Sequence, residues 1–201
     1  MSSSFDPDFQ SYSTEAKIVA SLERISEAFR VLLWNESKAH GLSPLQVQVL
    51  IFLHYHSEEK CTVSYLAKEF NMAKPTISDT VKILERKELI QKVKSPIDTR
   101  SYVIALTSKG KQLAAVTSSF SQPIQQPIEQ LSAGQKEELL ASLVKVISQL
   151  NGAGVINVQR MCFNCAHYRP QQDGHAHFCN LLNTPLEPSQ LRVDCKEHQP
   201  A

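Results

Sequence analysis

The stretch that most constrains the fold runs from residue 63 to residue 106, where two short helical patterns are followed by two strand-like runs. Apolar residues recur at helical spacing in both helical segments, at Val63, Leu66, Ala67 and Phe70 and then at Ile77, Val81 and Leu84. Asn71 and Met72 turn the chain between them, and Pro75 suits the first turn of the second helix. The runs 89–93 and 102–106 are joined by KSPIDTRS, whose Pro and Asp predict a hairpin turn.

Positive charge is concentrated in the same part of the chain. The formal net charge is only +1, yet residues 74–111 hold nine basic residues against four acidic ones, a net of +5 that leaves −4 for the remainder. Two short helices and a basic hairpin are typical of a winged helix-turn-helix, in which one helix enters the major groove of DNA. The alternative is a merely solvated face, because Asp79, Glu85 and Glu88 dilute the positive charge.

The candidate DNA-binding residues lie on the outward face of the second short helix and on the hairpin. Hydroxyls and basic groups on the helix can reach base edges or phosphates, and the hairpin supplies sequence-independent attraction or an arginine for a narrow minor groove. These residues are Thr76, Ser78, Lys82, Arg86, Lys92, Lys94 and Arg100.

Long apolar helices flank this region. Apolar residues at steps of three and four predict one helix over 14–39, Ser43 with Gln46 begins a second that is apolar on nearly every side, and Ser132 with Gln135 begins the last. Thr107 begins another, which Pro123 and Pro127 must kink or split. A winged helix needs only residues 42–106, so these apolar stripes need a partner, either in a second copy of the chain or on their own subunit. We expect a mainly α fold with a small β wing that forms a homodimer.

The segments LSPLQVQVLIFL, TVSYLAKEFNMAKPTISDTVKILERKELI and DTRSYVIALTSKGKQL closely resemble the MarR family of winged-helix regulators. The resemblance covers residues 14–150, and the family's wing signature falls on Asp98, Arg100, Leu106, Thr107, Lys109 and Gly110. It implies that Arg100 is the wing-tip contact, that Asp98 helps position it, and that residues 74–82, with Lys74 and Asp79, read DNA. Glu88 departs from the family, which commonly has glycine there.

The same resemblance implies properties of the assembly. In the family, flanking helices interlock between two subunits and place two recognition helices about one turn of DNA apart, so the operator is roughly palindromic double-stranded DNA. Members are commonly repressors and often bind small phenolic effectors between the dimer helices and the winged domain. The implied function is a dimeric, sequence-specific transcriptional regulator that responds to a small molecule, a metal or a redox signal.

Residues 161–201 form a cysteine-rich tail after a linker, residues 151–160, that begins with NGAG. The tail holds Cys162, Cys165, Cys179 and Cys195 at the spacing C-x2-C-x13-C-x15-C. Thiolates are strong metal ligands, and a small segment with few core residues needs a bound metal or a similar cross-link to fold. We therefore expect the tail to bind a metal, with zinc as the common structural case. An iron–sulfur cluster, a zinc set of Cys162, Cys165, Cys195 and His198, or unliganded thiols are the alternatives. Cys61 is expected to be a buried apolar residue in a short strand over 61–63.

Other features narrow the class of protein. Residues 1–13 lack the order of a signal peptide, no apolar run is long enough to span a membrane, and we expect a cytoplasmic protein with residues 1–13 as a flexible N-terminus. No nucleophile elbow, phosphate loop or H-E-x-x-H motif is present, so no enzymatic activity is expected. The alternative function is a metal-dependent redox or carrier protein, or a protein-interaction module, that uses the winged domain only as a scaffold.

Overall fold

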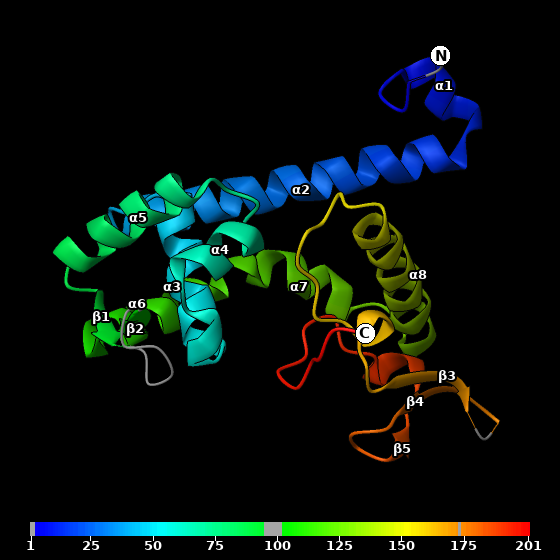
Figure 1. Cartoon of the computed structure of the whole chain (residues 1–201). Helices are drawn as coiled ribbons and strands as arrows, with labels where there is room; N and C mark the ends of the chain where they lie inside the picture. The colour runs from blue at the N-terminus through cyan, green and yellow to red at the C-terminus, as the bar shows by residue number, and fades with distance from the viewer. Residues whose placement is uncertain (1–2, 95–101, 173) are drawn as a thin grey trace.

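The computed structural model describes residues 3–94, 102–172 and 174–201 and is mainly helical, with two small antiparallel sheets (Figure 1). The helices are α1 (Pro7–Tyr12), α2 (Thr14–Ala39), α3 (Pro44–Tyr55), α4 (Val63–Glu69), α5 (Lys74–Arg86), α6 (Ser108–Thr117), α7 (Gln122–Glu129) and α8 (Ala133–Gly152). The strands are β1 (Ile90–Lys94), β2 (Tyr102–Leu106), β3 (Tyr168–Gln172), β4 (His175–Cys179) and β5 (Thr184–Pro185). The expected mainly α fold with a β wing is confirmed.

Local capping sets most helix starts. Ser43 and Gln46 form a reciprocal capping box at α3, and Ser132 with Gln135 does the same at α8. Thr107 accepts a hydrogen bond from the Gly110 amide at the start of α6. In the N-terminal segment that we expected to be flexible, Asp6 caps α1, because its carboxylate accepts from the Asp8 amide at 3.0 Å.

The winged domain has one hydrophobic core centred on α3. Helices α4, α5 and α6 and the β1–β2 hairpin surround α3, which is apolar on nearly every side as predicted. The hairpin pairs Ile90 with Leu106 and Lys94 with Tyr102. The core residues from these elements include Val49, Leu50, Leu53, Leu66, Ile77, Val81, Leu84, Leu89, Ile104 and Ala114.

Two left-handed residues make the sharp turns that define the domain. Asn71 (φ 50°) follows α4, and Glu88 (φ 59°) follows α5. After each helix the chain closes with the same pair of backbone bonds, for example from the Leu89 amide to the Leu84 carbonyl at 3.0 Å and from the Glu88 amide to the Glu85 carbonyl at 2.9 Å. The turns therefore fix α5 against α4 and the hairpin against α5.

The strand expected over residues 61–63 does not form. A 3-10 turn, η1 (Glu58–Lys60), leads into Cys61, and Thr62 caps α4 by accepting from the Tyr65 amide. The Cys61 carbonyl still pairs with the hairpin, accepting from the Ile104 amide at 2.8 Å. Cys61 is nevertheless buried, with 3% of its surface exposed. The helix cap outweighs strand formation because it commits the chain to helix at Val63.

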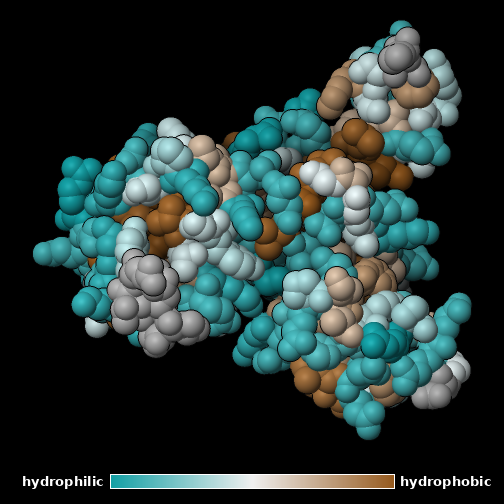
Figure 2. All heavy atoms as spheres, in the orientation of Figure 1, coloured by the Kyte–Doolittle hydropathy of each residue, from teal (hydrophilic) through white to brown (hydrophobic). Residues whose placement is uncertain are grey.

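The prolines split the region after Thr107 as expected. Helix α6 ends at Thr117, a 3-10 turn follows at η2 (Ser118–Ser121), and α7 begins beyond it with Pro123 in its first turn and Pro127 inside. Helix α2 extends from the winged domain across one end of α8, and the tail lies at the other end of α8 (Figure 1). Large apolar side chains remain exposed on both flanking helices, at Ile18, Leu22, Ile25 and Phe29 on α2 and at Leu139, Val146 and Leu150 on α8. Figure 2 shows the hydrophobic surface along α2.

The tail folds as a small three-stranded sheet, β3–β4–β5, with two 3-10 turns, η3 (Cys162–Asn164) and η4 (Pro188–Gln190). The turn η4 packs on α8, and Met161 is fully buried. The preceding residues 151–160 are docked rather than free, since Asn157 Nδ2 donates to Asn71 Oδ1 at 2.7 Å. In the described part of the chain, no helix is both long and apolar enough to cross a membrane.

Candidate nucleic-acid interface

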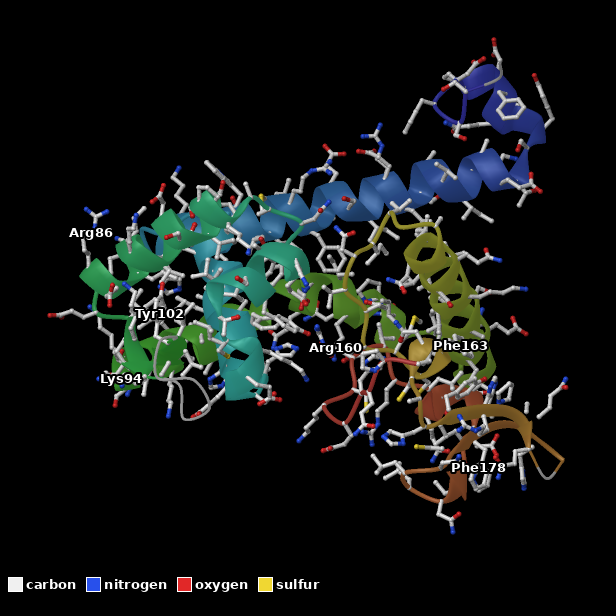
Figure 3. The ribbon with its side chains drawn as sticks, in the orientation of Figure 1. Arg86, Lys94, Tyr102, Arg160, Phe163 and Phe178 are labelled. Carbon is white, nitrogen blue, oxygen red and sulfur yellow. The ribbon has the colours of Figure 1, made fainter. Side chains whose placement is uncertain are left out.

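Helix α5 presents a polar face to solvent. Its apolar face is fixed in the core by Ile77, Val81 and Leu84, each at most 1% exposed. The opposite face exposes Lys74, Thr76, Asp79, Lys82 and Arg86, while Ser78 is half-buried. Figure 3 shows Arg86 at the far end of α5, at the same end of the molecule as Lys94 of the hairpin. A rigid helix with outward hydroxyls and cations has the form of a groove-reading helix.

The start of α5 differs from the starts of the other long helices. Side chains cap α2, α3, α6 and α8, but Ala73 precedes α5 and makes no side-chain cap. The first amides of α5 and the exposed Lys74 therefore share the positive end of the helix dipole, which favours a phosphate. Sequence analysis missed this feature, although alanine in place of a capping residue was a readable signal.

Two candidate lysines already have acidic partners. Lys92 Nζ lies 2.6 Å from Glu85 Oε2 and 5.4 Å from the centroid of the Tyr102 ring. The Glu85 hydrogen bond raises the pKa of Lys92, so this lysine fastens the hairpin to α5. Lys82 Nζ lies 3.0 Å from Asp79 Oδ1, with both side chains exposed. Among the described residues, Lys74, Arg86 and Lys94 have no ion-pair partner and are the cations most available to DNA. Asp98 and Arg100 lie outside the described residues.

A second polar cluster, which sequence analysis did not identify, joins the tail to the winged domain. Arg160 is 7% exposed, and its Nη1 and Nη2 lie 2.7 and 3.1 Å from the Glu69 carboxylate at the end of α4. Nη1 also donates to the Tyr65 hydroxyl at 3.1 Å. On its other side Arg160 Nε lies 2.6 Å from Asp194 Oδ1. We call Arg160, Glu69, Asp194, Tyr65 and His56 the Arg160 cluster.

His56 completes this cluster from the end of α3. Its Nε2 lies 3.0 Å from Asp194 Oδ2, and its ring stacks on Phe52 at 3.8 Å between centroids. Hydrogen bonds from His56 and then from Arg160 hold the pKa of Asp194 well below its usual range. Asp194 therefore stays ionised near neutral pH, and the cluster joins elements that are far apart in the sequence.

The four tail cysteines surround one cavity of about 330 Å³. Its walls also include Leu181, Leu182, Leu186 and Arg192. All four cysteines are free thiols, and burial raises the pKa of Cys162. Within the described residues, no three His, Cys, Asp or Glu side chains are already arranged to hold a metal ion.

The alternative ligand His198 lies outside this cavity lining. Its Nε2 is 3.0 Å from both the carbonyl and the side-chain oxygen of Asn164. The structure thus brings the four cysteines together around one cavity, whereas His198 contacts Asn164 outside it.

Comparison with known proteins extends these observations. Residues 40–101 match the model of the MarR family. Over 111 residues the chain is 26% identical to the HTH-type transcriptional regulator SarZ of Staphylococcus haemolyticus (strain JCSC1435), an alignment that covers 55% of this chain and 74% of that regulator. The fold is similar to that of S. aureus MepR in a MepR–DNA complex, with a TM-score of 0.56, 30% identity and coverage of 66% of this chain and 97% of MepR. MepR in a DNA-binding conformation gives a TM-score of 0.58 at 28% identity, over 66% of this chain and 98% of that structure.

Proposed function

Because the chain belongs to the MarR family of winged-helix transcription regulators, we propose that it binds a roughly palindromic operator as a homodimer and represses transcription. It is a DNA-binding regulator and not an enzyme. The observation that carries the finer proposal is the exposed face of α5, which is rigidly held, uncapped and cationic at its start. The repressor role rests on the family resemblance alone.

Most of the candidate residues have a proposed role at the operator. Lys74, Arg86 and Lys94 contact phosphates, because they are exposed and have no ion-pair partner within the described residues. Thr76 and Ser78 face base edges from the first turns of α5. Lys82 reaches DNA after leaving Asp79, a small cost for two exposed side chains. Asp98 and Arg100 keep the wing-tip roles that the resemblance implies.

The homodimer is proposed from the exposed apolar side chains on the flanking helices. Ile18 and Ile25 on α2 are 55% and 47% exposed, and Val146 on α8 is 43% exposed. Apolar surface of this kind along two helices is unfavourable in water and is removed when a second copy covers it. A twofold pairing also places two α5 helices on one face of the DNA, as a palindromic operator requires.

Binding to duplex DNA at several salt concentrations tests operator recognition. Lys74→Ala and Arg86→Ala should each weaken binding to all sequences and reduce the slope of log affinity against log salt by about one for each subunit, or about two for the dimer. Lys145→Ala, which removes an exposed cation from α8, is the matched control and should keep the slope. The proposal fails if the unchanged protein binds duplex DNA with no salt dependence, or if all three variants behave alike.

Light scattering tests the dimer. Ile25→Lys places a charge in the proposed interface and should give a monomer with weakened operator binding. Glu27→Lys, on the opposite side of the same helix, should remain dimeric, because it disturbs only an exposed pair with Arg24. A dimer that tolerates Ile25→Lys would place the interface elsewhere.

A further inference from the structure

The geometry points to an iron–sulfur cluster bound by Cys162, Cys165, Cys179 and Cys195, whose presence is transmitted to α4 through Arg160. The first part concerns the tail alone. The second part rests on the proposed function, since its readout is affinity for DNA.

The cavity supplies the ligands for such a cluster. All four cysteines line the same space of about 330 Å³, and none of them is in a disulfide. They come from η3, from the end of β4 and from the last turn-rich segment, so the tail folds around this space. Four cysteine thiolates are the usual ligand set of iron–sulfur clusters.

The size of the cavity between the thiols favours a cluster over a single zinc ion. Four sulfurs at about 2.3 Å from one zinc ion lie only about 3.8 Å from one another. Here the thiols stand around a cavity, and in the described ranges no three ligand side chains are already poised around a single ion. A cluster of several iron and sulfide ions fills a cavity of about 330 Å³, whereas a single zinc ion requires the four sulfurs to converge on one point.

Arg192 prepares the site for negative sulfur. Its backbone amide donates to Cys162 Sγ at 3.3 Å, and its Nη1 donates to Cys195 Sγ at 3.4 Å. Hydrogen bonds to ligating sulfurs and a nearby cation stabilise a cluster of thiolates and tune its potential. Leu181, Leu182 and Leu186 form an apolar part of the wall, which also includes His167 and Glu197.

Assembly of a four-iron cluster illustrates the balance of the binding step. Two ferric ions, two ferrous ions and four sulfides combine with four cysteine thiols, one sulfur binds each iron, and four thiol protons pass to solvent. No electron is gained or lost, because each iron ion keeps its oxidation state and the four iron ions and four sulfides together give a core of charge 2+.

The backbone beside two of the ligands leads directly to Arg160. The Cys195 amide donates to the Arg160 carbonyl at 2.8 Å, and the Cys162 amide donates to the Arg192 carbonyl at 3.1 Å. Arg160 is two residues before Cys162, and its partner Asp194 is next to Cys195. A cluster that holds Cys162 and Cys195 together therefore also holds the guanidinium of Arg160 in place.

Arg160 then contacts the helix-turn-helix. It binds Glu69, the last residue of α4, and Figure 3 shows it between the winged domain and the tail. The turn at Asn71 connects α4 to the groove-reading helix α5. Loss of the cluster releases the tail, withdraws Arg160 and leaves Glu69 unpaired, so the cluster-bound protein binds DNA more tightly.

The cluster is tested on full-length protein purified without oxygen, as isolated and after incubation with ferrous iron, ferric iron and sulfide. We expect a brown protein with charge-transfer absorption, and iron and acid-labile sulfide in equal amounts. Cys162→Ser with Cys165→Ser should abolish the absorption, while Cys61→Ser, which changes a buried cysteine outside the cavity lining, should keep it. A colourless protein with one bound zinc ion, or one with no metal after incubation, would overturn the assignment.

The coupling is tested by comparing DNA affinity with and without the cluster. The unchanged protein should lose about fivefold or more in affinity when the cluster is removed. Glu69→Gln should keep the iron and sulfide content. It should bring the ratio of DNA affinity with the cluster to DNA affinity without it towards one, because the neutral amide cannot form an ion pair with Arg160. Glu58→Gln, the same change on an exposed residue, should keep the full ratio. Equal or tighter binding by the cluster-free protein would overturn the coupling while leaving the cluster assignment intact. Failure of every form to bind DNA would instead count against both operator recognition and the coupling.

Discussion

The Nε atom of Arg160 lies 2.6 Å from Oδ1 of Asp194, while the other side of the same guanidinium lies 2.7 Å from Oε2 of Glu69. One buried cation thus joins two carboxylates from different parts of the fold. Burial lowers the pKa of Arg160, but the hydrogen bonds that it donates to Asp194 and Glu69 outweigh this effect and raise that pKa, so Arg160 stays charged.

Arg160→Ala should destabilise the docked tail on the order of 3 kcal/mol. The substitution leaves Glu69 with an unpaired charge in a mostly buried position, and removing one partner of a buried ion pair costs about this much. Urea unfolding and limited proteolysis of residues 161–201 measure the effect. Arg24→Ala breaks an exposed pair with Glu27 and should cost less than about 1 kcal/mol. Equal protease resistance in both variants would contradict a structural role for Arg160.

Gly110→Ala should destabilise the winged domain by about 3 kcal/mol, because its new Cβ would stand 1.9 Å from the Leu89 carbonyl oxygen. That atom belongs to the backbone at the start of the hairpin, so relief requires the hairpin to move. Gly134→Ala, where no atom lies within 4 Å of the new Cβ, should stabilise α8 by about 0.5 to 1 kcal/mol. Thermal unfolding of the two variants should therefore shift in opposite directions.

Glu88→Gly should stabilise the protein by about 0.5 to 1 kcal/mol. Glu88 is exposed and has a left-handed backbone (φ 59°), a conformation that costs a residue with a Cβ but suits glycine. Glu137→Gly, within the regular helix α8, should destabilise by about 1 kcal/mol and serves as the control. If both glycine variants lose stability equally, the turn does not strain Glu88.

Cys61 should resist alkylation in the folded protein. Burial, followed by the charges of Glu58 and Glu59, raises the pKa of Cys61 to about 11, so at pH 8 roughly one thiol in a thousand is ionised. Mass spectrometry after iodoacetamide treatment should find Cys61 unmodified while cluster-free tail cysteines react, and all five cysteines should react in urea. Rapid native modification of Cys61 would show that the core around η1 opens.

The same shift predicts a pH dependence of stability. A thiol that ionises near pH 8.5 in the unfolded chain stays protonated in the folded chain up to about pH 11. The stability contributed by protonated Cys61 is therefore complete below about pH 8.5 and is lost progressively as the pH rises to about 11. Cys61→Val should remove this part of the alkaline decline in the free energy of unfolding.

Features set by neighbouring residues were predictable from the sequence. The capping boxes at Ser43 and Ser132, the helix over 14–39 and the hairpin strand over 102–106 depend on local spacing, and all are confirmed. The strand at Cys61 was wrong because a cap at Thr62 competes for the same residues. The periodicity of apolar residues does not by itself show whether these residues will form a helix cap or a strand.

Features that depend on tertiary contacts were not predictable in this way. Arg160 is a single arginine in a segment interpreted as a linker, and its partners Glu69 and Asp194 are 91 and 34 residues away. Nothing in the local pattern of residues 151–160 indicates a buried cation. The cysteine spacing predicted a shared site in the tail, and it left open which of Cys179 and His198 takes part; the structure places Cys179 at the cavity. The ligand set itself stays a prediction.

The side-chain bond between Asn157 and Asn71 has a consequence for how the protein unfolds. It secures the segment before the tail to the turn between α4 and α5. The ion pair between Arg160 and Glu69 lies close by, because both of its residues are within three positions of this asparagine pair. Two anchors on the same part of the winged domain make the tail a cooperative extension of that domain rather than an independent module. Heating should therefore melt both parts in one calorimetric transition, and amide protons of α4 and β4 should exchange with solvent through the same opening event.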